Sequence, residues 1–298
     1  MLEETLNRVC EDRIREHIGA LEGVRHPVAA PEALERAADY IQASLESLNY
    51  TVEPHLFDFA GREYRNIVAT RQGARNPEER LLVIAHYDTV KGSPGADDNA
   101  SGVAVLLEAA RVLEPVNSGL TVQFAAVNLE ERQGEGTLDE AGLWGSRALA
   151  ARAVKENWQI AGAIVLEMVG FAGESIAQAT PGGLPIQVPE HGDFIGVIGN
   201  TVSRNLVDSF VQATQRYGLG LPVVPLVVPG NGEMLEATRR SDHAPFWDRG
   251  YKAIMLTDTA EFRSPHYHQP TDTIETLNLP FAAQVCRAVV AMAMDVAK

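Results

Sequence analysis

Cysteine is scarce in this sequence. Of its 298 residues only two are cysteines, Cys10 and Cys286, and they lie near opposite ends of the chain. No Cys-x-x-Cys spacing occurs, so the sequence indicates neither a disulfide framework nor a zinc site built from thiolates. We expect both thiols to be buried core side chains.

Positive charge is also in short supply. The chain has 25 lysines and arginines against 40 aspartates and glutamates, which gives a formal net charge of -15. Nucleic acids and anionic membranes bind basic faces, so this composition argues against both as partners. An excess of carboxylates suits metal cations instead.

A targeting segment and a membrane-spanning run are not predicted. Residues 1–19 are charged throughout and lack the basic start and apolar stretch of a secretory signal. A cytoplasmic location is therefore expected, with an exported protein whose signal has been trimmed as the alternative. Internal repeats and low-complexity linkers are missing too, so residues 1–298 are expected to form a single domain.

The hydrophobic pattern predicts alternating helices and strands. A helical pattern behind Pro31 covers residues 31–49, and a second covers residues 99–115. Continuous apolar runs suit central strands that helices cover on both faces, which indicates an α/β fold. The predicted strands are 63–73 and 80–88, with 74–79 as the turn between them, and apolar runs within 120–131, 162–170 and 251–258.

Three of these apolar runs carry charged residues at or near their carboxyl ends. The run over 80–88 ends on His86 and Asp88, and the run over 120–131 ends on Glu130 and Glu131. Ligands bind at the carboxyl ends of the strands in open α/β sheets. Glu167 lies inside an apolar run, where a carboxylate is costly to bury unless a cation accompanies it.

The charged residues form a candidate metal site. Two histidines and three carboxylates without thiolates suit a catalytic zinc site, with cobalt or manganese as alternatives. Two metals about 3.5–4 Å apart that share a carboxylate would neutralise the charge of the segment HYDTVKGSPGADDNASG. The candidate ligands are His86, Asp98, Glu130 or Glu131, Glu167 and a histidine within 264–273.

The ordered motifs resemble the di-zinc aminopeptidase family of metallo-exopeptidases, whose clan includes glutamate carboxypeptidase II and glutaminyl cyclase. Each motif is weak alone, but the set occurs in the family's order. The resemblance implies a three-layer αβα fold with a central mixed, mostly parallel sheet and a metal site at the carboxyl ends of its strands. The matching segments are AHYDTV, GADDNASG, NLEE, LWGSRALA, LEMVG, RSDHAPF and SPHYHQPTDT.

The resemblance implies ligands for two divalent ions. His86, Asp98 and Glu167 would bind one ion. Asp98, Glu131 and His268 would bind the other, so that Asp98 bridges the two metals.

The resemblance also implies catalytic residues. Glu130 would be the general base that acts on a metal-bridged water, and the Tyr267 hydroxyl would help to stabilise the oxyanion. Asp88 would accept the second ring N–H of the first histidine ligand and fix its tautomer. Asp242 and Arg240 are the candidates for contact with substrate.

Two features depart from the family pattern. Many members carry aspartate where this chain has Glu167, and the extra methylene puts in doubt the tightness of the first metal site and the recognition of the α-amine. Residues 132–142 are longer than in the compact aminopeptidases, and we expect them to form a loop near the entrance of the site.

The predicted function is a metal-dependent exopeptidase, with an aminopeptidase acting on peptides with a free N-terminus as the leading hypothesis. A single-zinc glutaminyl cyclase and a carboxypeptidase or dipeptidase specificity are the enzymatic alternatives. A non-catalytic interaction module with the same fold is the least favoured. The preferred substrate side chain and the oligomeric state are not predicted.

Overall fold

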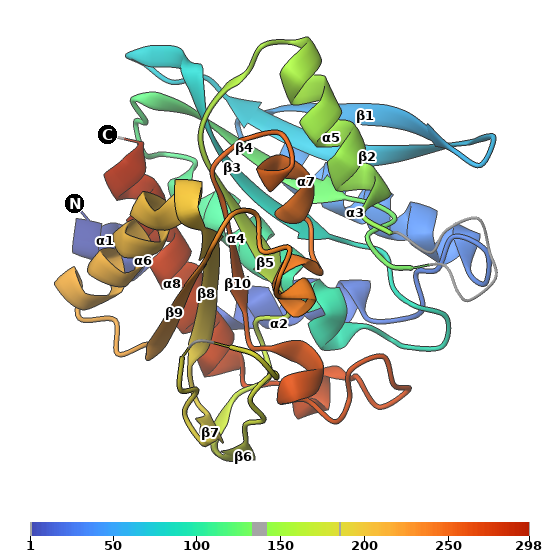
Figure 1. Ribbon diagram of the computed structural model, residues 1–298. Coiled ribbons are helices and arrows are strands. Elements are labelled where there is room, and N and C mark those ends of the chain that lie inside the picture. The colour runs from blue at the N-terminus through green and yellow to red at the C-terminus, as the bar shows by residue number, and fades with distance from the viewer. Residues whose placement is uncertain (1, 133–141, 185, 298) are drawn as a thin grey trace.

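The computed structural model of the protein has an eight-stranded sheet at its centre (Figure 1). It describes residues 2–132, 142–184 and 186–297. A separate two-stranded hairpin pairs β6 (Gly173–Ala177) with β7 (His191–Gly192). The strands of the main sheet are β1 (Thr51–Phe59), β2 (Arg62–Arg71), β3 (Asn76–His86), β4 (Leu120–Val127), β5 (Gln159–Glu167), β8 (Ile195–Asn200), β9 (Val223–Val228) and β10 (Ala253–Thr257).

The strand order is β1-β2-β4-β3-β5-β10-β8-β9. Strands β4, β3, β5 and β10 run parallel in the centre, and β8 and β9 are parallel to each other. Antiparallel pairs join β1 to β2, β2 to β4 and β8 to β10. The sheet is therefore mixed and mostly parallel, as the family resemblance implied.

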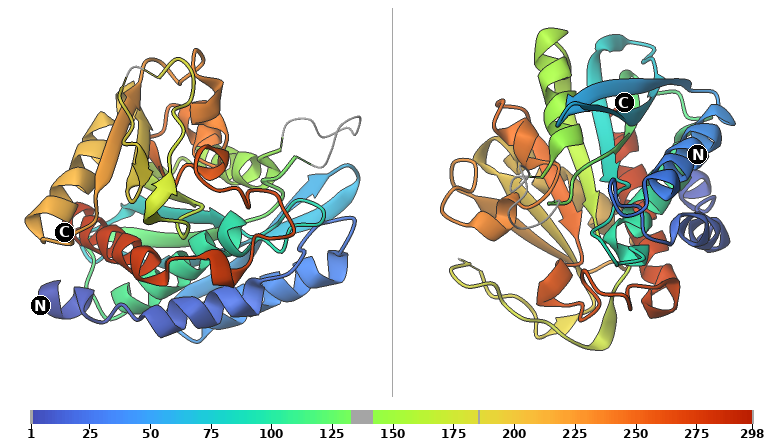
Figure 2. Two further views of the ribbon diagram at one scale, coloured as in Figure 1. Left: turned by 90° about the horizontal axis from the view of Figure 1, so that it is seen from below. Right: turned by 90° about the vertical axis from the view of Figure 1, so that its right-hand side faces the viewer.

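Helices cover both faces of this sheet (Figures 1 and 2). Buried side chains from each set of helices join one of two apolar clusters, one on each face. The predicted three-layer α/β fold is thus confirmed. One layer contains α2 (Glu11–Leu21), α3 (Pro31–Glu46), α4 (Gly102–Leu113), α6 (Arg204–Arg216) and α8 (Leu279–Val296), and the other contains α5 (Trp144–Lys155) and α7 (Ala244–Trp247).

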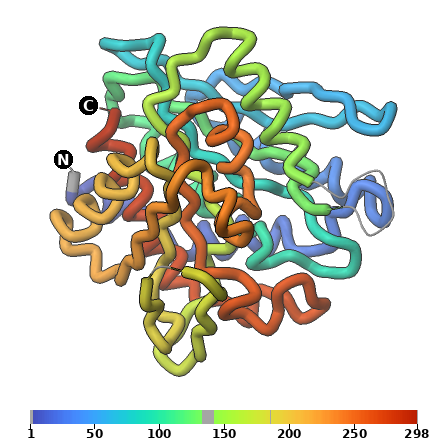
Figure 3. Tube along the Cα trace, in the orientation of Figure 1, coloured from blue at the N-terminus to red at the C-terminus, as the bar shows by residue number. Residues whose placement is uncertain are grey.

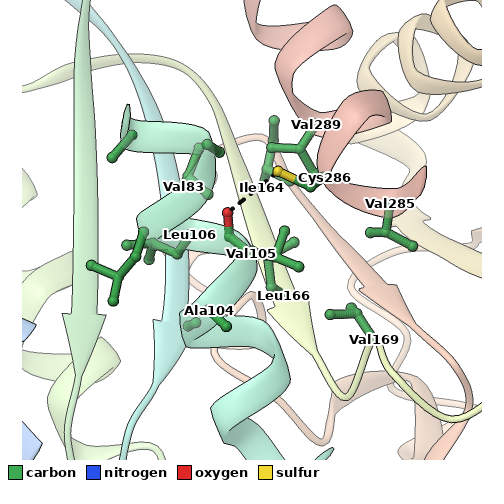
Figure 4. Close-up of a cluster of buried hydrophobic side chains, with 14 of the residues drawn as sticks. Val83, Ala104, Val105, Leu106, Ile164, Leu166, Val169, Val285, Cys286 and Val289 are labelled. Carbon is green, nitrogen blue, oxygen red and sulfur yellow. Dashed lines mark hydrogen bonds between the residues drawn. The ribbon is translucent and has the colours of Figure 1, made fainter. Parts of the chain in front are cut away.

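Branched aliphatic side chains fill the core between the sheet and α4 and α8 (Figure 4). Ile164 on β5 is fully buried, as are Val105 on α4 and Val289 on α8. The thiol of Cys286 lies among them, 3.8 Å from the carbonyl oxygen of Val105. Cys286 is buried as predicted, whereas Cys10 is partly exposed, and both are free thiols.

Helix α8 has the length and composition of a membrane span, which the sequence analysis did not anticipate. However, 67% of its 18 residues are buried inside the protein, where the helix packs against α2, α4 and α6. This is the pattern of a core helix. The short first helix α1 (Leu2–Leu6) also contacts it, so the first and last helices lie side by side (Figure 3).

The predicted elements agree with the structure except at strand boundaries. The helix predicted over 31–49 is α3, and the one over 99–115 is α4, which begins at Gly102 after an irregular segment. The turn predicted over 74–79 is wrong because Asn76 and Glu79 already pair with β4 and β5. The pairing register shifts between Asn76 and Arg80, and this irregularity accommodates Pro77, which has no N–H to donate.

The core packing predicts a position-dependent cost of truncation. Replacing Ile164 by alanine removes buried methyl groups from the central strand and should lower the free energy of unfolding by about 2–5 kcal/mol. Val154 on α5 is 50% exposed, so Val154→Ala is the control and should cost less than about 1 kcal/mol. Urea denaturation measures both, and equal losses would contradict the assigned core.

Candidate functional site

The candidate ligands gather at the carboxyl edge of the parallel strands. His86 is the last residue of β3, and Glu167 is the last residue of the neighbouring strand β5. Glu131 follows the end of β4, and Asp98 lies in the segment that leads into α4. His268 comes from the loop after β10. Five separate segments therefore supply one site, as expected for this edge of an α/β sheet.

These five residues form two groups that share Asp98. His86, Asp98 and Glu167 make one group, and Asp98, Glu131 and His268 make the other, with the ligand atoms of each group within 4.8 Å of one another. The two carboxylate oxygens of Asp98 face different groups. Oδ1 lies 3.3 Å from Nε2 of His86, and Oδ2 lies 3.2 Å from Nε2 of His268.

The separations between these atoms fit metal coordination. Nε2 of His86 lies 3.4 Å from Oε1 of Glu167, and Nε2 of His268 lies 3.2 Å from Oε2 of Glu131. Ligand atoms about 2.0–2.1 Å from a tetrahedral zinc ion are about 3.3–3.4 Å apart. Each group offers one imidazole nitrogen and two carboxylates, a donor set that suits a divalent transition metal. The residues present thus fit two divalent ions.

Crowding of carboxylates shifts the pKa values of the site. Burial raises the pKa of Glu131 to about 7, and the charge of Asp98 adds to this effect. Burial lowers the pKa of His268, but hydrogen bonds to Asp98 and Glu131 outweigh it and raise the value to about 10. The metal-free site therefore holds protons at neutral pH that a metal must displace.

Side-chain hydrogen bonds fix the segment that carries Asp98. The carboxylate of Asp272 accepts the backbone N–H groups of Asp97 and Asp98 at 2.9 and 3.1 Å. The amide of Asn99 donates to the carbonyl of Leu166 at 2.7 Å and accepts the N–H of Met168 at 3.1 Å. The Asp98 segment is thereby joined to both the end of β5 and the loop of His268.

Arg25 is a buried residue of the site that sequence reasoning missed. Its side chain is buried, at 2% exposure. Among the described residues, every hydrogen-bond acceptor of its guanidinium is a backbone carbonyl. Gly95, one acceptor, has φ of +62°, and a Cβ there would lie 2.3 Å from the carbonyl oxygen of Asp98. Burial lowers the pKa of Arg25 to about 10, opposed by Asp88 and Asp98, so it remains charged. The acceptors are the carbonyls of Leu21, Gly23, Tyr87, Pro94 and Gly95.

Asp88 contacts the backbone of the glutamate pair as well as the ring that was predicted. Its carboxylate accepts the N–H groups of Glu130 and Glu131 at 3.0 and 3.1 Å. Oδ1 of Asp88 also lies 3.6 Å from Nδ1 of His86, which is an ion-pair distance but longer than a hydrogen bond. Asp88 thus orients the two glutamates and also lies beside the ring of His86. Its predicted role of fixing the tautomer of that ring stays a prediction.

Glu130 differs from the five grouped residues because it belongs to neither group, and like His268 it is partly exposed. Burial and the charges of Glu167 and Glu131 raise its pKa well above the ordinary range, against the opposing effect of His86. A carboxylate at the edge of the site that is not itself part of a metal group is a candidate for proton transfer.

The backbone beside three of the site residues adopts left-handed φ values. Leu129, Met168 and His268 have φ of 56°, 48° and 58°. Non-glycine residues in this region cost about 1–3 kcal/mol each and persist where surrounding contacts fix them. The turns that follow β4 and β5 therefore adopt a backbone conformation that is uncommon for residues other than glycine. These turns lie directly beside Glu130 and Glu167.

Glu167 reaches the site despite its extra methylene. Its Oε1 atom is near His86, and its Oε2 atom accepts a hydrogen bond from the Ser241 hydroxyl at 2.6 Å. Ser241 lies in the RSDHAPF motif. The sequence analysis singled out Asp242 and Arg240 of this motif but not Ser241. The carboxylate is thus held at both oxygens.

The predicted substrate-contact residues have different surroundings. Asp242 is fully buried and lines neither cavity of the site, so the predicted contact with substrate is wrong. Arg240 is paired with Glu261 and donates to the Tyr267 hydroxyl at 3.1 Å. The Tyr267 ring stacks on His268 with 3.8 Å between ring centroids.

Two cavities meet at the site. The larger has a volume of about 1120 Å³ and is lined by Glu130, Glu131, Asp98 and His268 among others. The smaller has a volume of about 110 Å³ and a mostly apolar lining. Glu167, Arg240 and Tyr267 line both cavities. Of the segment expected near the entrance, residues 133–141 lie outside the described residues.

The protonation of the site predicts that metal affinity increases with pH. The raised pKa values of His268 and Glu131 mean that protons compete with the metal at pH 6 and compete less at pH 8. Zinc titrations by calorimetry in buffers of different ionisation enthalpy should detect proton release on binding. Affinity that is independent of pH, without proton release, would contradict the assigned groups.

The contacts of Arg25 predict that it supports both folding and the Asp98 segment. Arg25→Met removes the charge and leaves its buried carbonyl acceptors without their donor, so unfolding free energy should fall by about 3 kcal/mol or more. Zinc affinity, measured by competition with a chromophoric chelator, should fall as well. Arg36→Met on the exposed side of α3 is the control. Unchanged zinc affinity in Arg25→Met would contradict this role.

Sequence comparison identifies a family. Residues 66–293 match Peptidase family M28. The uncharacterized protein YfbL of Escherichia coli strain K12 is 32% identical over 98% of this chain and 90% of its own length. Aminopeptidase YwaD of Bacillus subtilis is 28% identical over 74% of this chain and 42% of its own. Apart from YfbL, the chain thus spans about half the length of the curated relatives that it matches.

Solved structures share the fold. The LapA aminopeptidase of Legionella pneumophila has a TM-score of 0.77 at 18% identity, covering 99% of this chain and 73% of that one. The glutaminyl cyclase of Macrostomum lignano has a TM-score of 0.73 at 21% identity, covering 98% and 90%. Together with the sequence matches, these similarities confirm the predicted resemblance. The chain belongs to Peptidase family M28.

Proposed function

We propose that the protein is a metal-dependent aminopeptidase that removes the N-terminal residue of peptides. The observation that carries this proposal is the pair of histidine–carboxylate groups sharing Asp98, with Glu130 beside them in the same cavity. Membership of a metallopeptidase family and the similarity to aminopeptidases support it.

The proposal assigns two divalent ions to the two groups, with zinc favoured over cobalt or manganese. His86, Asp98 and Glu167 would hold one ion, and Asp98, Glu131 and His268 the other. When bound, the ions supply Lewis acidity that polarises a carbonyl and lowers the pKa of water towards ~7. A relative from Leptosphaeria maculans is named a probable zinc metalloprotease, and the BSAP structure from Bacillus subtilis is titled a zinc aminopeptidase.

Glu130 is the proposed general base. Its carboxylate lines the cavity and is held near the metal groups by the hydrogen bond from its own N–H to Asp88. It would take a proton from the attacking water and pass it to the leaving amine.

Tyr267 is the proposed donor to the oxyanion. Arg240 donates to the hydroxyl oxygen, so the hydroxyl proton is left available for a developing negative charge. Burial and the charges of Asp98 and Glu131 raise the pKa of Tyr267, which keeps the hydroxyl protonated.

Charge and shape of the cavities favour a free N-terminus. Glu130 and Glu167 line the cavity and would bind the substrate's ammonium group, which an acetylated peptide lacks. The smaller cavity would receive the first side chain. Its lining includes Phe194, Ile198, Leu226 and Met255, so we expect an apolar side chain there.

Glutaminyl cyclase is the second candidate function. The solved cyclases match nearly the full length of this chain, and the one from Porphyromonas gingivalis is covered over 98% of its own length. Against this candidate, both candidate metal groups are complete here. One bound metal per chain and cyclisation of N-terminal glutamine would favour the cyclase.

Aminoacyl p-nitroanilides and their N-acetylated counterparts test the proposal directly. Protein dialysed against chelator and then titrated with zinc, cobalt or manganese should hydrolyse the unblocked compounds only, with apolar first residues preferred. Hydrolysis of blocked compounds, or no hydrolysis with both metal groups filled, would contradict an aminopeptidase.

The proposed role of Glu130 predicts a separation of turnover from metal binding. Glu130→Gln should lower kcat by at least about 100-fold, since general-base catalysis contributes 10²–10⁴-fold. Bound zinc should remain as in the unmodified protein because Glu130 belongs to neither metal group. Loss of zinc from this variant would make Glu130 a ligand and overturn its assignment as the base.

A further inference from the structure

The large cavity has opposite charges on its floor and its rim. Carboxylates of the candidate metal site form the floor, since Asp98, Glu131 and Glu167 line the cavity and are at most 9% exposed. Four arginines also line this cavity, although the chain as a whole carries a net charge of -15. The four arginines are Arg132, Arg147, Arg239 and Arg240.

Two of these arginines are already paired with carboxylates. Arg239 forms an ion pair with Asp248 at 2.7 Å, and Arg240 is paired with Glu261. Neither Arg132 nor Arg147 has an ion-pair partner within the described parts of the chain, and both are exposed. Among the described residues, Arg132 and Arg147 are thus the two arginines of this cavity that have no carboxylate partner.

The placement of Arg147 is not explained by the stability of its helix. Arg147 lies in the first turn of α5, where the positive end of the helix dipole disfavours a cation. Its guanidinium lies 5.6 Å from the centroid of the Trp144 ring. Contact with an aromatic face restricts a guanidinium while leaving its N–H groups available to bind a carboxylate in a bidentate manner.

We infer that Arg132 and Arg147 bind the C-terminal carboxylate of the substrate, which makes the preferred substrates short peptides with a free C-terminus. This inference rests on the proposed aminopeptidase function. A short peptide carries an ammonium group at one end and a carboxylate at the other, and the cavity offers carboxylates on its floor and guanidinium groups on its rim. Its volume of about 1120 Å³ accommodates a ligand of a few residues.

Two further acidic residues among the described ones lie at this cavity. Glu236 and Asp248 also line the cavity, but Asp248 is neutralised by Arg239. Bidentate pairing of arginine with a carboxylate is a charge-assisted interaction and is directional. A peptide amide has lost the negative charge and should therefore bind more weakly than the free acid.

A matched pair of peptides tests the inference. The tripeptide Leu-Gly-Gly and its C-terminal amide differ only in the charge of the terminus. We expect kcat/KM for the acid to exceed that for the amide by about 10-fold, in line with one hydrogen bond between charged groups at a solvated site. In the double variant Arg132→Gln, Arg147→Gln, this ratio should fall towards one because KM for the free acid increases.

Controls separate the inference from the proposed function. Arg204→Gln removes an exposed charge outside the cavity and should keep the ratio of the unmodified protein. Binding of both peptides to zinc-loaded Glu130→Gln protein, measured by calorimetry, gives the same comparison without turnover. Equal affinity for acid and amide, or an acid preference that survives in the double variant, would overturn the inference. Acid-selective binding without hydrolysis of either peptide by the unmodified protein would support it while contradicting the aminopeptidase proposal.

Discussion

Mutual repulsion of buried carboxylates is the constraint on which the site depends. Asp98, Glu131 and Glu167 lie together at the edge of the sheet, and each is at most 9% exposed. Such a cluster is costly to bury unless it is protonated or paired with cations. Two histidines and Arg25 offset part of the charge, and two divalent ions are the compensation that the spacing of the ligand atoms fits. The same crowding and burial raise the pKa values of Glu130 and Glu131 in the metal-free protein.

A second set of polar groups holds the site residues in position. Asp88 and Asp272 do not belong to the metal groups, yet each accepts two backbone N–H groups from segments that carry site residues. Asn99 joins the Asp98 segment to the end of β5. These contacts fix the backbone, which allows left-handed φ values at Leu129 and His268. Orientation of ligands by surrounding hydrogen bonds is a general feature of metal sites.

The sequence was sufficient for the fold class and for the composition of the site because both depend on local patterns. Apolar runs that end on His86 and Glu167 indicate strands with functional carboxyl ends, and the structure brings those residues together. Side-chain contacts between residues far apart in the sequence could not be predicted. Arg25 is far in sequence from the Asp98 segment that it supports, and GVRHP carries no recognisable motif. Asp242 was misassigned, and the contacts of Asp88 with the glutamate pair were missed, because a motif gives the identity of a residue but not its burial or the direction of its side chain.

Metal stoichiometry tests the central claim that two ions share Asp98. Protein stripped with chelator, reconstituted with zinc and freed of excess metal is analysed by inductively coupled plasma mass spectrometry beside Asp98→Ala. The account predicts about two zinc ions per chain in the unmodified protein and the loss of both in the variant, because each group loses the carboxylate that they share. One ion per chain in the unmodified protein, or an unchanged zinc content in Asp98→Ala, would contradict it.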